Sequence, residues 1–92
     1  MLSVDVKDLE NYNGKDMGHS DWMSIDQDRI NLFADATGDH QWIHVNEEKA
    51  QKELPTKSTS AHGFLSLSLS VPLAGKIWKV TGAKMMINYG LN

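Results

Sequence analysis

The chain has 92 residues, enough for one domain and too few for two. Nine Lys and Arg residues stand against twelve Asp and Glu residues, and no basic stripe with interleaved aromatic residues occurs, so we expect no binding to nucleic acid. The absence of cysteine excludes disulfides, thiolate metal ligands and cysteine nucleophiles. Because no apolar stretch has the length of a signal peptide or a membrane span, we expect a cytoplasmic protein without membrane contact.

The first quarter of the chain predicts two short elements. The first ten residues are expected to form a helix, since Leu2, Val6 and Leu9 fall roughly on one helical face. A turn-rich stretch with an Asn-Gly step follows. The alternation of apolar and polar residues over 22–25 then favours a short strand.

Two helices are predicted in the middle of the chain from their capping residues. An apolar stripe over 27–36, with Ser24 and Asp26 as possible caps before it and Gly38 as a stop after it, predicts the first helix. Asn46 is typical of an N-cap, and the charged run that follows predicts a second helix over 47–53. The stretch 38–45 between them has no regular pattern.

The run FLSLSLSV over 64–71 permits two interpretations. Its leucines alternate with serines, which is the period of a strand, and the pattern alone favours that interpretation. A buried helix is the alternative, because a serine in a helix can bond to the carbonyl one turn back. Beyond this run, residues 76–80 are expected to form a loop or strand, a Thr-Gly turn follows, and 85–89 are expected to form the last strand.

Asp39 and His44 are the strongest candidates for chemistry. A loop beginning at Gly38 carries both, and a loop can direct two side chains five residues apart at one water molecule. A carboxylate with an imidazole is a suitable acid–base pair at neutral pH. The plainer alternative is that Asp39 caps a turn and His44 is a buried histidine with satisfied hydrogen bonds, and for an isolated Asp–His pair this alternative is favoured.

Gly63 is a candidate for binding an oxyanion. If a helix begins at His62-Gly63, the amide of Gly63 is one of the first-turn donors that lack a partner within the helix. Such an amide can stabilise a developing negative charge, and glycine lets a carbonyl approach closely. Taken alone, a simple helix-start or turn glycine is the favoured interpretation.

Two other chemistries are weaker. His40 and His44 have the spacing of two metal ligands on a helix, with Asp39 as a possible third. The stretch between them has no helical pattern and no HExxH motif occurs, so we predict no metal site. The serines lack the GxSxG context of a nucleophile, and we interpret them as packing residues.

The two motifs together resemble the MaoC-like hydratase family, and within it the branch that includes nodulation protein N. The likeness covers roughly residues 20–92 and rests on FADATGDHQWIHVNEEKA at 33–50, STSAHGFLSLSLSVPL at 58–73 and the terminal INYGLN. The family pattern falls here on Phe33, Gly38, Asp39, His44, Ala50 and the Ala-His-Gly step at 61–63. Gln41-Trp42 replaces the Asn-Pro of many hydratases, which affects the expected substrate range more than the chemistry.

The resemblance implies an α+β hot-dog fold, in which an antiparallel sheet wraps around a central helix. It therefore places a helix at about 62–73 against the strand pattern, with Pro72 kinking or ending it. It also implies reversible hydration of a trans-2-enoyl thioester to an (R)-3-hydroxyacyl thioester. Asp39 would be the base, His44 would bind the same water and relay its proton, and the Gly63 amide would hold the thioester oxygen.

The resemblance further implies a substrate carried on coenzyme A or acyl-carrier protein, no other cofactor, and a homodimer or higher homo-oligomer. Members of the family are longer than this chain, so residues 1–92 are expected to be the N-terminal portion of one hot-dog domain whose remaining strands follow. The two strands expected over 22–25 and 85–89 cannot cover the central helix by themselves, so its leucines would be exposed. A non-catalytic acyl-thioester-binding or interaction module is therefore the alternative to the enzyme.

Overall fold

The computed structural model describes residues 1–91, which divide into two compact units. The sheet unit consists of Met1–Asp21 together with the chain from Val71 onward, and the histidine unit is Trp22–Ser70. Among residues 1–91, no helix has the length and apolar character needed to cross a membrane.

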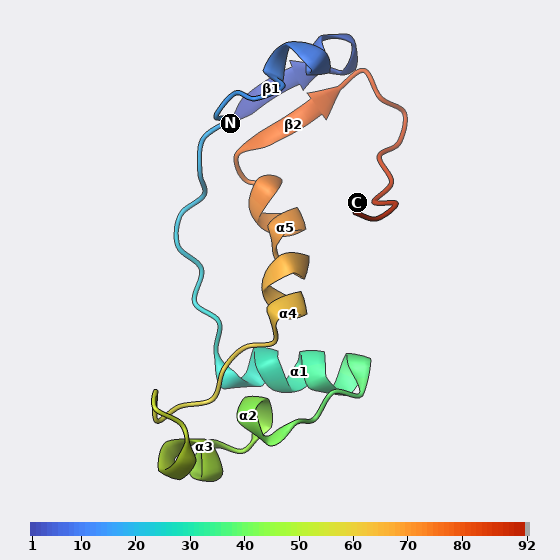
Figure 1. The fold of residues 1–92 in the computed structure, drawn as a ribbon. Coiled ribbons are helices and arrows are strands. Elements are labelled where there is room, and N and C mark those ends of the chain that lie inside the picture. The colour runs from blue at the N-terminus through green and yellow to red at the C-terminus, as the bar shows by residue number, and fades with distance from the viewer. Residues whose placement is uncertain (92) are drawn as a thin grey trace. The chain divides into compact units, whose positions relative to one another are not determined.

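The sheet unit contains a pair of parallel strands (Figure 1). Strand β1 (Leu2–Asp5) lies beside β2 (Trp78–Thr81), and Val4, which is buried, faces Val80 across the pair. A 3-10 helix, η1 (Val6–Tyr12), follows β1. The prediction of a helix over the first ten residues was wrong for β1, because pairing with a segment more than seventy residues away outweighs the local helical spacing.

Two further strand predictions were wrong. Residues 22–25 and 85–89 have no regular secondary structure, and the strands in the described part of the chain are β1 and β2. Trp22 and the apolar residues over 85–89 are largely exposed. Alternation indicates a strand only where a neighbouring strand accepts its backbone hydrogen bonds, and neither segment has one in the described chain.

The first helix of the histidine unit was predicted correctly. Helix α1 (Gln27–Thr37) begins after Asp26, whose carboxylate accepts a hydrogen bond from the Arg29 amide at 2.9 Å. It ends at Gly38, which has φ of +82° and donates its amide hydrogen to the Ala34 carbonyl at 2.8 Å. A left-handed residue at this position is the common way to end a helix, and glycine adopts it without steric cost.

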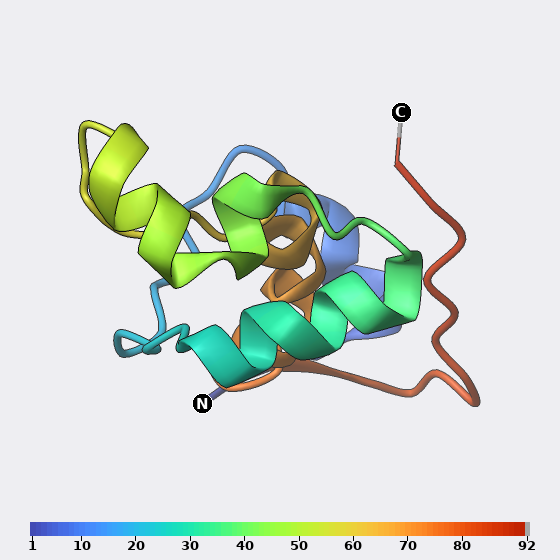
Figure 2. The same cartoon turned by 90° about the horizontal axis from the view of Figure 1, so that it is seen from below.

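Two short helices follow α1 in the histidine unit (Figure 2). Helix α3 (Glu47–Glu53) is capped by Asn46, as predicted, whose side chain accepts a hydrogen bond from the Lys49 amide at 3.0 Å. Helix α2 (Trp42–Val45) lies in the stretch predicted to be irregular. A single turn of helix has no periodicity that a sequence pattern could reveal.

The serine–leucine run is helical, so the strand interpretation of its pattern was wrong and the helix implied by the family resemblance was right. It forms α4 (Gly63–Ser68) and α5 (Ser70–Ala74). Leu65 and Leu69 are buried while Leu67 is 47% exposed, which is the period of a helix and not of a strand. The interruption falls at Leu69 rather than at Pro72, which lies within α5 and has no amide hydrogen to donate.

The chain is thus α+β, with several helices and a small sheet, as predicted. The two described strands pair in parallel. The antiparallel sheet wrapped around a central helix, and the placement of residues 1–92 within one such domain, stay predictions.

Candidate functional site

Asp39 lies in the short connection between α1 and α2, directly after the glycine that ends α1. Its amide hydrogen points to the Thr37 hydroxyl at 3.3 Å, and its carboxylate accepts a hydrogen bond from the Gln41 amide at 3.3 Å. The side chain is exposed. Both contacts are long for hydrogen bonds that involve a backbone amide. Because the Gln41 amide is the weak donor to the carboxylate, the carboxylate oxygens can still accept hydrogen bonds from other donors.

His44 is buried within α2, where it is only 9% exposed. Its Nδ1 lies 2.6 Å from the Ser60 carbonyl oxygen, which can only accept, so Nδ1 carries the hydrogen. In the neutral ring, Nε2 is then the nitrogen with the free lone pair. A backbone carbonyl therefore fixes the tautomer of this imidazole and the direction of its Nδ1–H bond.

His62, the residue before α4, is buried more deeply, at 4% exposure. Its Nε2 donates to the Asp39 carbonyl oxygen at 3.0 Å. Its ring stacks on that of His44, with centroids 3.8 Å apart and planes 23° apart, and also contacts Phe33 with centroids 4.9 Å apart. The remaining ring nitrogen, Nδ1, is buried and has no hydrogen-bond partner within the described part of the chain.

These contacts bring three titratable side chains together. A carboxylate oxygen of Asp39 and one ring nitrogen each of His44 and His62 lie within 4.8 Å of one another. A water molecule with two ordinary hydrogen bonds of about 2.8 Å each can bridge such a separation. The sequence prediction placed Asp39 and His44 at one water, and the structure puts their side chains within that reach.

His40 lies apart from this cluster although it is next to Asp39 in the chain. Its Nε2 is 2.9 Å from the Asp35 carboxylate, and both side chains are more than half exposed. The hydrogen bond with Asp35 raises the pKa of His40 above its ordinary value, with smaller contributions from the charges of Asp35 and Asp39. His40 is therefore a surface partner of α1.

Several residues that hold the site in place were missed by the sequence analysis. The side-chain amide of Gln27 donates to the His44 carbonyl at 2.8 Å, and its oxygen accepts from the Thr59 hydroxyl at 2.5 Å. The Ser60 amide donates to the Ile43 carbonyl at 2.9 Å. These bonds tie the segment before α4 to α1 and α2. Because they join residues 17 to 32 positions apart, no local sequence pattern indicates them.

Gly63 is the first residue of α4, where its amide is one of the first-turn donors without a partner inside the helix. A Cβ built on Gly63 would have no atom within 4 Å. The protein itself therefore does not require glycine at this position for space, and its φ is not in the left-handed region. Its role in binding an oxyanion stays a prediction.

The same three residues, Asp39, His44 and His62, are the group in the described chain whose ligand atoms could surround a cation. An imidazole binds a metal through a lone pair that lies in the plane of the ring. Two rings stacked at 3.8 Å with nearly parallel planes cannot both aim such a lone pair at one ion without moving. The arrangement suits proton transfer better than metal coordination, and His62 replaces His40 in the set considered from sequence.

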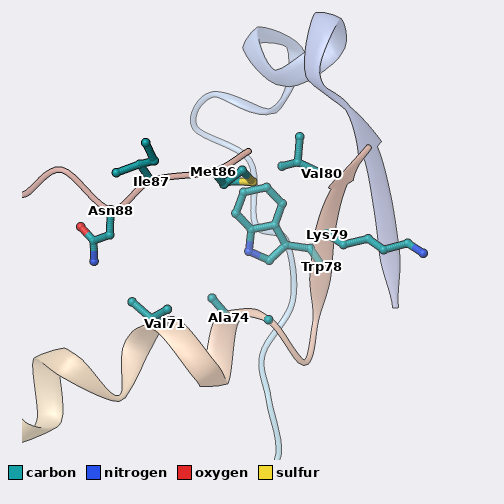
Figure 3. Close-up of a pocket in the computed structure, with 9 residues that line it drawn as sticks. Val71, Ala74, Trp78, Lys79, Val80, Met86, Ile87 and Asn88 are labelled. Carbon is teal, nitrogen blue, oxygen red and sulfur yellow. The ribbon is translucent and has the colours of Figure 1, made fainter. Parts of the chain in front are cut away.

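The sheet unit has a separate apolar groove of about 430 Å³ (Figure 3). The Trp78 ring forms its centre, with Met86 close to the ring and Val71 and Ala74 on the neighbouring helix. Apart from Lys79, Gly75 and Asn88, its lining is apolar. No part of the histidine cluster lines this groove.

The sequence matches one family of known proteins over most of its length. Residues 8–92 match the MaoC like domain family. The 3-hydroxyacyl-thioester dehydratase Z of Mycobacterium tuberculosis is 52% identical over 87 residues, which is 95% of this chain and 57% of that protein. Nodulation protein N of Rhizobium leguminosarum bv. viciae is 44% identical over an alignment of 93 positions, which covers the whole of this chain and 58% of that protein.

The chain therefore spans less than two thirds of the length of these relatives. The family match nevertheless includes both the Asp39–His44 connection and the start of α4. The chain belongs to the MaoC-like domain family.

Proposed function

We propose that this chain carries the acid–base half of a hydratase/dehydratase site that interconverts a trans-2-enoyl thioester and an (R)-3-hydroxyacyl thioester. The observation that supports this most is the proximity of the Asp39 carboxylate and the His44 imidazole, within 4.8 Å. The similarity to a protein named for 3-hydroxyacyl-thioester dehydration points to the same chemistry.

In the hydration direction, the Asp39 carboxylate accepts a proton from the attacking water. His44 uses its free Nε2 to bind the same water and helps to pass the proton to the α-carbon of the substrate, while its Nδ1 stays on the Ser60 carbonyl. In the reverse direction the same two groups remove the elements of water. Positioned acid–base groups of this kind contribute about 10²- to 10⁴-fold to a rate.

The Gly63 amide is proposed to hold the thioester oxygen as enolate charge develops. Helix α4 is short, so the contribution comes from the amide hydrogen itself rather than from a long helix dipole. The open space where a Cβ would lie is consistent with close approach of a carbonyl. Losing a single oxyanion donor typically costs about 3 kcal/mol of transition-state stabilisation.

The substrate is proposed to be an acyl thioester of coenzyme A or acyl-carrier protein, in the cytoplasm, with no metal or further cofactor in the reaction. A homodimer or higher homo-oligomer is the proposed assembly. The whole hot-dog domain, with its antiparallel sheet around the central helix, is the proposed setting of the site.

The test is hydration of crotonyl-CoA by the 92-residue chain, followed by the loss of the enoyl-thioester absorbance. Asp39→Asn and His44→Ala should each lower kcat by about 10²-fold or more. Asp21→Asn and His19→Ala are matched controls, since both residues are exposed and belong to the sheet unit. Circular dichroism of each variant establishes that the helices are retained.

Turnover that is unchanged in both site variants would remove the assigned roles. The alternative function, a non-catalytic acyl-binding module, predicts that crotonyl-CoA binds in calorimetry without being hydrated. A folded protein that contains the whole hot-dog domain and neither binds nor hydrates the thioester would contradict both proposals.

A further inference from the structure

His62 has no role in the proposed chemistry, yet it contacts both residues that do. Its Nε2 bonds to the backbone carbonyl of Asp39, and its ring lies against the ring of His44. It is also the most buried polar residue of the histidine unit, at 4% exposure. One side chain thus links the connection that carries the carboxylate to the helix that carries the imidazole.

Simple packing does not account for a histidine at this position. His62 occupies one helical face with the buried leucines Leu65 and Leu69, where an apolar side chain would fill the same space. Its Nδ1 is buried without a partner in the described chain, and an unpaired buried polar atom lowers stability. Its side chain makes no capping hydrogen bond to α4 either.

We infer that His62 is a positioning residue for the acid–base pair, an inference that rests on the proposed function of Asp39 and His44. The hydrogen bond from the His62 Nε2 fixes the position of the Asp39 backbone carbonyl. The His62 ring stacks on the His44 ring and restricts its rotation. The second support of His44 is the Ser60 carbonyl, which fixes the ring from Nδ1. Together the two contacts leave the His44 ring with one orientation.

Two variants separate the two contacts. His62→Gln keeps an amide donor at the distance of Nε2 and removes the ring. His62→Phe keeps a flat ring against His44 and Phe33 and removes the donor. His62→Ala removes both, and Leu65→Val is a matched control that perturbs the same buried face without touching either contact.

The first measurement is the nuclear magnetic resonance spectrum of the His44 ring in the 92-residue chain, which requires no activity. Stacked rings shift the proton resonances of each other, so His62→Gln and His62→Ala should remove a ring-current shift that His62→Phe retains. Leu65→Val should retain this shift.

The second measurement is the kinetics of crotonyl-CoA hydration. Because misplacing a reacting group by about 1 Å can cost about 10²-fold, His62→Ala should lower kcat by roughly that factor with little change in KM. Each of the two partial variants should recover part of this loss. If the loss came only from a less stable fold, Leu65→Val, which perturbs the same buried face, would lower the active fraction of the protein as well.

The two proposals fail separately. If the chain shows no turnover but the His44 resonances respond as expected, His62 holds the His44 ring in place and the hydratase assignment is what fails. His44 resonances in His62→Ala that match the unsubstituted chain, or a kcat loss no greater than that of Leu65→Val, would overturn the positioning role.

Discussion

The two units of this protein are stabilised by different kinds of contact. In the histidine unit, side chains bond to backbone groups far away in sequence, as Gln27 does to His44 and His62 does to Asp39. In the sheet unit, order comes from four residues of β1 paired with four of β2, and the residues from 82 to 91 have no helix or strand. The proposed chemistry lies wholly within the unit whose side chains are fixed individually.

The contrast has a physical reason. A catalytic side chain must keep its angle as well as its place, and for His44 a backbone carbonyl bonded to one ring nitrogen and a ring stacked on its face define both. Strand pairing fixes the backbone and leaves exposed side chains free to rotate. The histidine unit therefore has the features of a preorganised site, and the sheet unit does not.

The largest stability difference between the units should come from their long-range side-chain bonds. Gln27→Ala removes a donor and an acceptor that satisfy His44 and Thr59, and should lower the free energy of unfolding by about 1–3 kcal/mol. Thr81→Val in the sheet unit removes only a contact of 3.5 Å to the Val4 carbonyl and keeps the β-branched shape, so it should change little. Urea unfolding measures the change in the free energy of unfolding for both variants. Equal changes would contradict the difference expected between the two units.

Two glycines with nearly the same backbone angle offer a finer test. Gly38 in the histidine unit has φ of +82° with open space around a built Cβ, so Gly38→Ala should cost only the left-handed strain, about 1 kcal/mol. Gly82 in the sheet unit has φ of +81°, but its Cβ would lie 3.3 Å from the Asp5 carboxylate. Gly82→Ala should therefore cost more than Gly38→Ala in urea unfolding. The reverse order would show that neighbouring atoms are not what distinguishes the two sites.

The smallest expected effect concerns the surface of the histidine unit. Asp35→Ala removes the main cause of the raised pKa of His40, so that pKa should fall toward the ordinary value of 6.5 in a titration followed by nuclear magnetic resonance. Because the folded state raises this pKa, the pair stabilises the fold at acidic pH, below the unfolded pKa. That stabilisation is lost as the pH rises through the folded pKa. Both groups are exposed, so the change in stability should be slight; an unchanged pKa in the variant would refute the assignment.

Local signals in the sequence predicted the capped helices well. Asp26, Gly38 and Asn46 mark helix ends through contacts with residues three or four positions away, and these contacts depend on little else. Strands depend on a distant partner. Neither strand predicted over 22–25 or 85–89 forms, while β2 overlaps the stretch 76–80 that was expected to be a loop or strand. The helix in the serine–leucine run followed from the family resemblance and not from its alternating pattern.

The candidate site was predictable only in part. The spacing of Asp39 and His44 suggested a pair, and the structure brings the two side chains together. The contacts that hold the two residues could not be predicted, because they are made by the backbone carbonyls of Ser60 and Asp39. Every residue type has a backbone carbonyl, so the sequence does not indicate which one accepts a hydrogen bond. Gln27 contributes from a helix 17 residues before His44, where an isolated polar side chain has no distinguishing pattern.

The central claim is that Asp39 and His44 act on one water molecule as a unit, and a double-mutant cycle on crotonyl-CoA hydration tests it most directly. If the two groups act together, the Asp39→Asn/His44→Ala double variant should be no more than a few-fold slower than the slower single variant, because losing either group already abolishes their joint action. A double variant whose loss equals the product of the two single losses would show two independent residues and would contradict the account.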